Sequence, residues 1–169
     1  DFVFSWHGNA DLILAIVKLL EDAANAENDV FEVGVKGILL VEDSIRYYSN
    51  YLPELYKIVL TQSREFLTES LNDDQKKYRK RSRPKIFLAT CLEEAIAYFE
   101  KYRRNLLGVI SDVGMVFHKG DDPKTEKLDA GNDLVRIIRE YDPLMPVQLQ
   151  SSQGSLAKTA AELGLGYLK

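Results

Sequence analysis

The chain has 169 residues, of which 46% are hydrophobic and 28% charged, and its formal net charge is −4 at pH 7. This composition is typical of one soluble globular domain with room for an extra segment, and the mild charge does not favour nucleic-acid binding. The single cysteine, Cys91, excludes an internal disulfide and fits a cytoplasmic location. No apolar run approaches the roughly 20 residues of a membrane span, and no signal peptide is recognisable.

The first 35 residues are predicted to form a strand and a helix that stand apart from the main pattern. FVFSW, residues 2–6, is rich in β-prone side chains, and residues 11–25 place their apolar side chains on one helical stripe. The chain does not begin with Met, so we interpret residues 1–35 as the end of a preceding domain in a longer protein.

From residue 36 onward, predicted strands and helices alternate strictly. The strands are 35–41, 86–89, 107–111, 146–152 and a fifth that begins at 166; a helix begins after Asp43, and others cover 92–102, 134–141 and 156–163. Pro53 predicts a kink or a break in the first of these helices. The alternation predicts an α/β fold, a doubly wound five-stranded parallel sheet with helices on both faces.

Two polar insertions interrupt this pattern. Residues 61–84, which lead into the basic run KKYRKRSRPK, are expected to extend a helix into an exposed connector, and residues 116–133 form a long loop. Loops of this length are usually functional or mobile. We therefore expect them to cover a site or to contact another domain.

Three acidic residues directly follow two of the predicted strands. Glu42 and Asp43 come after the first strand, and Asp112 comes after the third. Ligands of doubly wound sheets gather beyond the carboxyl ends of the strands, so these carboxylates meet if the two strands are neighbours. Clustered carboxylates repel each other, and Mg²⁺, which takes oxygen ligands, would remove that repulsion. The alternative is that they are ordinary caps and turn formers.

Four motifs, ILLVEDS, VISDVGM, PVQLQSS and GYLK, resemble in order and spacing the receiver domain of two-component response regulators, the CheY-like, flavodoxin-like fold. The resemblance covers residues 36–169. It implies that Asp112 accepts a phosphoryl group from a phosphohistidine or a small phosphodonor. The other roles that it implies are Mg²⁺ binding by Glu42, Asp43, Asp112 and the Gly114 backbone carbonyl, and a phosphorylation switch formed by the Ser151 hydroxyl and the Tyr167 ring.

The resemblance also implies partners and a limited chemistry. The partners would be a sensor histidine kinase or a phosphotransfer protein and neighbouring domains of the same polypeptide, without membrane or nucleic acid. Catalysis would be restricted to self-phosphorylation and autodephosphorylation, and the sequence lacks P-loop, nucleophile-elbow, HExxH and dinucleotide-binding motifs. The stretch ILLVEDSIRYYSNYLPELY is further similar to receiver-like regions at the front of phosphoenolpyruvate synthase-like proteins.

Several departures from the family pattern leave a second interpretation open. The family's catalytic lysine follows the switch aromatic by three residues, whereas Lys169 follows Tyr167 by two. We expect the usual lysine just beyond residue 169, the alternative being that Lys169 itself does its work. Val116 replaces the family's proline, and Gln148 and Gln150 stand in a strand expected to be buried. The alternative function is a receiver-like protein-interaction module without phosphorylation, a regulatory part of a larger enzyme.

Overall fold

The computed structural model describes residues 2–68, 83–150 and 166–168. Of Tyr167 it describes only the backbone, and Ser151, Lys169 and the predicted helix 156–163 lie outside the described residues. The chain forms two compact units: a first unit of residues 1–37 and 44–86, and a second unit of residues 38–43 and 87–169. The assignment of residues 1–35 to a preceding domain stays a prediction.

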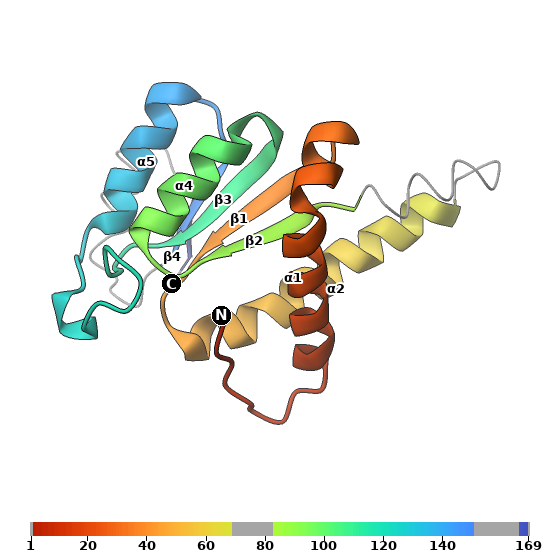
Figure 1. Cartoon of the computed structure of the whole chain (residues 1–169), viewed down its shortest axis with the longest axis horizontal. Coiled ribbons are helices and arrows are strands. Elements are labelled where there is room, and N and C mark those ends of the chain that lie inside the picture. The colour runs from red at the N-terminus through yellow and green to blue at the C-terminus, as the bar shows by residue number, and fades with distance from the viewer. Residues whose placement is uncertain (1, 69–82, 151–165, 169) are drawn as a thin grey trace. The chain divides into compact units, whose positions relative to one another are not determined.

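A parallel sheet carries the predicted site (Figure 1). Its strands are β1 (Gly37–Val41), β2 (Lys85–Ala89), β3 (Leu106–Asp112), β4 (Val147–Gln150) and β5 (Gly166–Leu168). Their order is β2-β1-β3-β4-β5, with β4 parallel to both β3 and β5. This is the order of flavodoxin-like doubly wound sheets, in which the strand order reverses between β1 and β3. The predicted α/β fold with a parallel sheet is confirmed.

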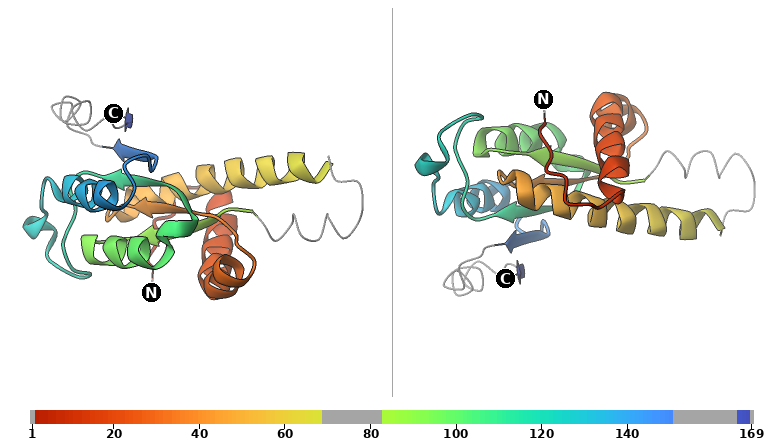
Figure 2. Two further views of the ribbon diagram at one scale, coloured as in Figure 1. Left: turned by 90° about the horizontal axis from the view of Figure 1, so that it is seen from above. Right: turned by 90° about the horizontal axis from the view of Figure 1, so that it is seen from below.

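Two helices of the second unit, α4 (Leu92–Tyr102) and α5 (Ala130–Tyr141), lie side by side in Figures 1 and 2. α4 has the predicted bounds, because Cys91 caps it by accepting a hydrogen bond from the Glu94 N–H at 3.5 Å. A short 3₁₀ helix, η2 (Arg103–Asn105), follows. α5 begins four residues earlier than predicted. Its first turn, Ala130, Gly131 and Asn132, is buried, but these residues form no apolar pattern that would predict a helix from the sequence.

The first unit contains α1 (Asp11–Glu27), the π-helix η1 (Asn28–Glu32) and α2 (Ile45–Thr68). α1 packs against α2. The helix predicted for residues 11–25 is confirmed, and α2 continues into the first insertion as expected. No helix in the described ranges is both long and apolar enough to cross a membrane.

One prediction for the first unit is wrong, and one of the two alternatives predicted for Pro53, a break of the helix, is contradicted. FVFSW is not a strand, because its backbone bonds to side chains: the Ser5 N–H donates to Ser49 Oγ at 3.0 Å, and the Tyr48 hydroxyl donates to the Val3 carbonyl. Pro53 does not break α2, which runs through it. Burial of the neighbouring Leu52 outweighs the single helix hydrogen bond that proline cannot donate.

A buried cluster of charged side chains joins α1 to the beginning of β2 within the first unit. The Asp22 carboxylate, with no exposed surface, accepts hydrogen bonds from Arg83 at 2.6 and 3.0 Å and from the Tyr56 hydroxyl at 2.9 Å. It also accepts the Ile86 backbone N–H at 3.0 Å and lies 3.5 Å from Lys85 Nζ. Burial lowers the pKa of Arg83, but its hydrogen bonds to Asp22 and the charge of that carboxylate raise it more, so the net shift is upward. These four residues, which contact Asp22, all belong to the first unit.

Candidate functional site

Three carboxylates meet where β1 and β3, neighbours in the sheet, end. One oxygen each of Glu42, Asp43 and Asp112 lies within 4.8 Å of the others. The convergence expected from the sequence is therefore present, because parallel neighbours end at the same edge of a sheet. The roles of these residues as metal ligands stay a prediction.

The backbone around the site holds the carboxylates in place. Glu42 is buried, and its N–H donates to the Ala89 carbonyl at 3.0 Å at the end of β2. Asp43 Oδ2 accepts the Val116 N–H at 3.3 Å. Burial raises the pKa of Asp43, although backbone hydrogen bonds from Val116 and from Asp43 itself oppose the shift. The Glu42 backbone is thus held by the end of β2, and the Asp43 carboxylate is held by the backbone after β3.

Asp112 has the most perturbed carboxyl group of the site. Its pKa is raised to about 6: burial is the largest cause, the charges of Asp43 and Glu126 add to the rise, and hydrogen bonds from the Val113 and Gly114 N–H groups oppose it. The Val113 N–H lies 2.7 Å from Asp112 Oδ1. The carboxylate form of Asp112 is therefore disfavoured chiefly by burial and, to a lesser extent, by the neighbouring negative charges of Asp43 and Glu126.

The donor set fits a magnesium ion. Mg²⁺ prefers carboxylate oxygens and retains several waters, and three carboxylates at this separation match that preference. Within the described ranges, neither Asp43 nor Asp112 forms an ion pair with a lysine or arginine. A divalent cation would supply the missing positive charge.

The remaining predicted site residues are placed only in part. Gly114 follows Asp112 by two residues, and an added Cβ there would overlap Oε1 of Glu126, so a glycine leaves room for that carboxylate. The role of the Gly114 carbonyl stays a prediction. Tyr167 lies in β5, where its backbone is paired with Leu149 of β4. Ser151 and Lys169 belong to the part that is not described.

No protein-family model and no curated protein matches this sequence. Three solved structures are similar to it. A response regulator receiver domain protein from Clostridium thermocellum shares 21% identity, with 79% of this chain and 81% of that chain covered and a TM-score of 0.46. Chemotaxis protein CheY4 from Vibrio cholerae shares 17%, with 79% and 85% covered and a TM-score of 0.40.

The third similar structure is the CheX–CheY–BeF₃–Mg²⁺ complex from Borrelia burgdorferi. It shares 18% identity over 82% of this chain and 81% of that chain, with a TM-score of 0.42. All three TM-scores lie below 0.5.

One residue beside the candidate site, Glu126, was not predicted from the sequence. It lies in the predicted loop 116–133, of which residues 130–133 belong to α5 in the structure. The loop contains the 3₁₀ helix η3 (Pro123–Thr125) and returns to the residues after β3. Its carboxylate stands over Gly114, and its charge contributes to the raised pKa of Asp112. An exposed acidic residue in a polar loop gives no sequence signal, because only the path of the loop brings it to the site.

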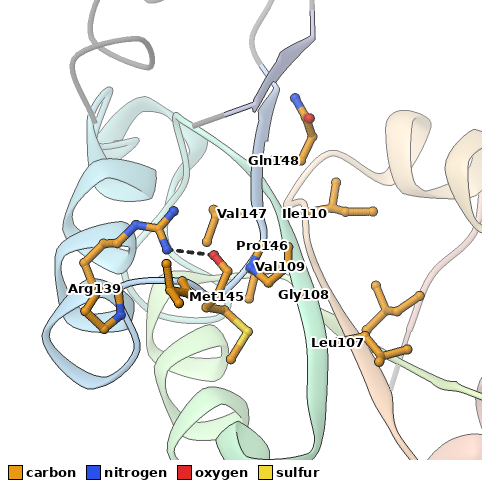
Figure 3. Close-up of a pocket in the computed structure, with 12 residues that line it drawn as sticks. Leu107, Gly108, Val109, Ile110, Arg139, Met145, Pro146, Val147 and Gln148 are labelled. Atoms are coloured by element: carbon orange, nitrogen blue, oxygen red, sulfur yellow. Dashed lines mark hydrogen bonds between the residues drawn. The ribbon is translucent and has the colours of Figure 1, made fainter. Parts of the chain in front are cut away.

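A separate pocket of about 600 Å³ lies at the opposite end of β3 and β4 (Figure 3). Its lining is mostly apolar and includes no acidic residue. Arg139 donates to the Met145 carbonyl at 2.7 Å there. Gln148, the unusual amide of β4, is half-buried and donates to the Leu149 carbonyl at 3.1 Å. The pocket contains none of the carboxylates and is not part of the candidate site.

Gly131→Ala is expected to destabilise the protein by about 1–3 kcal/mol, a typical cost of overpacking. An added Cβ at Gly131 would overlap the Asp112 carbonyl oxygen and lie 2.9 Å from Val113 Cα. These are backbone atoms, which cannot rotate away as a side chain can. Urea unfolding followed by circular dichroism measures the loss, and an unchanged midpoint would contradict the close packing of α5 on the end of β3.

Proposed function

We propose that the second unit is a response-regulator receiver domain in which Asp112 accepts a phosphoryl group in the presence of Mg²⁺. The observation that carries this proposal is the meeting of Glu42, Asp43 and Asp112 at the ends of β1 and β3. The order of motifs around these residues supports it. Partners of the domain would be a sensor histidine kinase or a phosphotransfer protein.

The proposed reaction requires little beyond alignment and compensation of charge. A carboxylate oxygen of Asp112 attacks the phosphorus atom of the donor and forms an acyl phosphate. The P–N bond of a phosphohistidine, or the P–O bond of a small phosphodonor, breaks, and the leaving group carries away the electron pair. Mg²⁺, held by Glu42, Asp43 and Asp112, would supply positive charge to the phosphoryl oxygens.

Other residues of the chain hold or sense this arrangement. The Val113 N–H, 2.7 Å from Asp112 Oδ1, orients the attacking carboxylate. The Val116 N–H does the same for Asp43. On the sequence motifs alone, the Gly114 carbonyl completes the metal ligands, and Ser151 and Tyr167 form the switch.

Incubation with acetyl phosphate and Mg²⁺ is expected to add one phosphoryl group to the wild-type chain. Asp112→Asn removes the nucleophilic oxygen, so its intact mass is expected to stay unchanged, as is that of the wild type in EDTA. Mass spectrometry of the intact chain measures the addition.

Asp11→Asn is the matched control for this experiment. Asp11 is an exposed aspartate in the first turn of α1, so its substitution makes the same chemical change outside the site. This variant is expected to be phosphorylated like the wild type. If the wild type gains no mass with Mg²⁺, and a chain extended past Lys169 does not gain it either, the protein-interaction module becomes the better interpretation.

A further inference from the structure

The loop 116–129 connects β3 to α5 in the second unit (Figure 2), and hydrogen bonds hold it at both ends of its path. At its beginning, the carbonyl groups of Val116 and Phe117 accept the N–H groups of Leu92 and Glu93, at the start of α4, at 3.1 Å each. Towards its end, Lys127 forms an antiparallel bridge with Met115, with hydrogen bonds of 3.0 and 3.2 Å. The segment before Lys127 is therefore held beside the residues that follow Asp112.

Side chains add to this fastening. His118 Nδ1 lies 3.0 Å from Glu93, and Lys119 donates to Glu94 at 2.9 Å. The Lys127 ammonium group donates to Asp133 in the first turn of α5. The loop thus contacts the beginnings of both α4 and α5.

Glu126 is placed at the Asp112 site by this path. Its Oε1 occupies the space where a side chain at Gly114 would begin. Its negative charge acts on Asp112 together with that of Asp43. Among the described residues, its carboxylate has no hydrogen-bond or ion-pair partner, because the adjacent Lys127 is directed to Asp133.

The position of Glu126 differs from that of the three clustered carboxylates. It is not part of the group whose oxygens all lie within 4.8 Å of one another, so it is not a direct ligand by this geometry. Mg²⁺ keeps several of its waters in proteins. A carboxylate outside the direct ligands can strengthen a metal site by accepting hydrogen bonds from these waters and by its negative charge.

We propose that Glu126 is a fourth acidic group of the Asp112 site, which raises the affinity for a divalent cation from outside the direct ligands. The inference rests on the proposed function, since it concerns the same cation. The long loop would then contribute to cation binding through Glu126, in addition to the three clustered carboxylates.

Calorimetric titration of the chain with MgCl₂ tests the inference without any phosphoryl donor. At low ionic strength, Glu126→Gln is expected to raise the Kd for Mg²⁺ about three- to tenfold, less than the effect of about 10–100-fold for buried outer groups, because Glu126 is exposed. Glu126→Asp retains the charge and is expected to stay within about twofold of the wild type.

Salt separates an electrostatic role of Glu126 from a structural one. The Debye length falls to about 3 Å in 1 M salt, so the effect of Glu126→Gln is expected to shrink to less than about twofold there. A loop disturbed by the substitution would weaken binding equally at both salt concentrations, and this result would overturn the inference.

Glu140→Gln is the matched control. Glu140 is an exposed glutamate in the last turn of α5, ten positions or about 15 Å along the helix from Ala130, and its substitution is expected to leave the Kd unchanged. If Glu126→Gln binds Mg²⁺ like the wild type while Asp112→Asn does not bind, the inference is wrong and the proposed function stands. If the wild type itself does not bind Mg²⁺, both are wrong.

Discussion

Asp22→Ala is expected to lower the free energy of unfolding by about 3–5 kcal/mol, the usual cost of removing one partner from a buried ion pair. The substitution leaves the guanidinium group of Arg83 and the ammonium group of Lys85 buried without their shared carboxylate. It also removes the acceptor of the Tyr56 hydroxyl and of the Ile86 N–H. Unfolding by urea, followed by far-ultraviolet circular dichroism, measures the loss.

Glu21→Ala is the control for this prediction. Glu21 precedes Asp22 on α1, lies 3.6 Å from the same Arg83, and is exposed. Exposed ion pairs contribute at most about 1 kcal/mol, so this variant is expected to lose no more than that. Equal losses in the free energy of unfolding for the two variants would show that the buried ion pair of Asp22 contributes no more than an exposed one.

The parts of the fold that were predicted are those with a local signal. α4 has its predicted bounds because its cap and its apolar stripe are adjacent in the sequence. β3 was found because it is an apolar run that ends in an acidic residue. FVFSW has the composition of a strand, but the acceptor of its Ser5 N–H is 44 residues away, so composition alone misplaced it.

The parts that were missed depend on contacts between distant residues. Asp22 was unremarkable within the predicted helix, yet it is buried because Arg83, 61 positions later, binds it. Glu126 reaches the site because Lys127 pairs with Met115. In contrast, the three clustered carboxylates were found, because the carboxyl ends of neighbouring parallel strands share one edge and each residue lies at or just after the end of its strand.

The raised pKa of Asp112 predicts how stability depends on pH in the absence of metal. The carboxyl group titrates at about 6 in the folded chain and at about 3.9 in the unfolded chain. Between these values the folded state holds a proton that the unfolded state has lost, so the free energy of unfolding falls as the pH rises through this range. A shift of two units corresponds to about 3 kcal/mol, of which we expect about 1–2 kcal/mol because the carboxyl is partly exposed to solvent.

Comparison of the wild type with Asp112→Asn isolates this contribution, because the other titrating groups are common to both chains. In EDTA, the variant is expected to gain stability relative to the wild type as the pH rises from about 4 to about 7. Urea unfolding at several pH values measures the difference. A difference that is constant over this range would show that the pKa of Asp112 is not raised.

The proton that Asp112 holds below about pH 6 is expected to oppose Mg²⁺ binding, although it stabilises the folded chain without metal. A carboxylate must lose its proton before it binds a cation, so the affinity of the wild type for Mg²⁺ is expected to fall about tenfold for each pH unit below about 6 and to level off above it. Calorimetry in buffers of different ionisation enthalpy would detect about one proton released per ion near pH 5.5 and almost none near pH 8. If the unfolding experiment shows the raised pKa, an affinity independent of pH between these values would show that Asp112 is not a ligand, because its charge would then not matter to the ion.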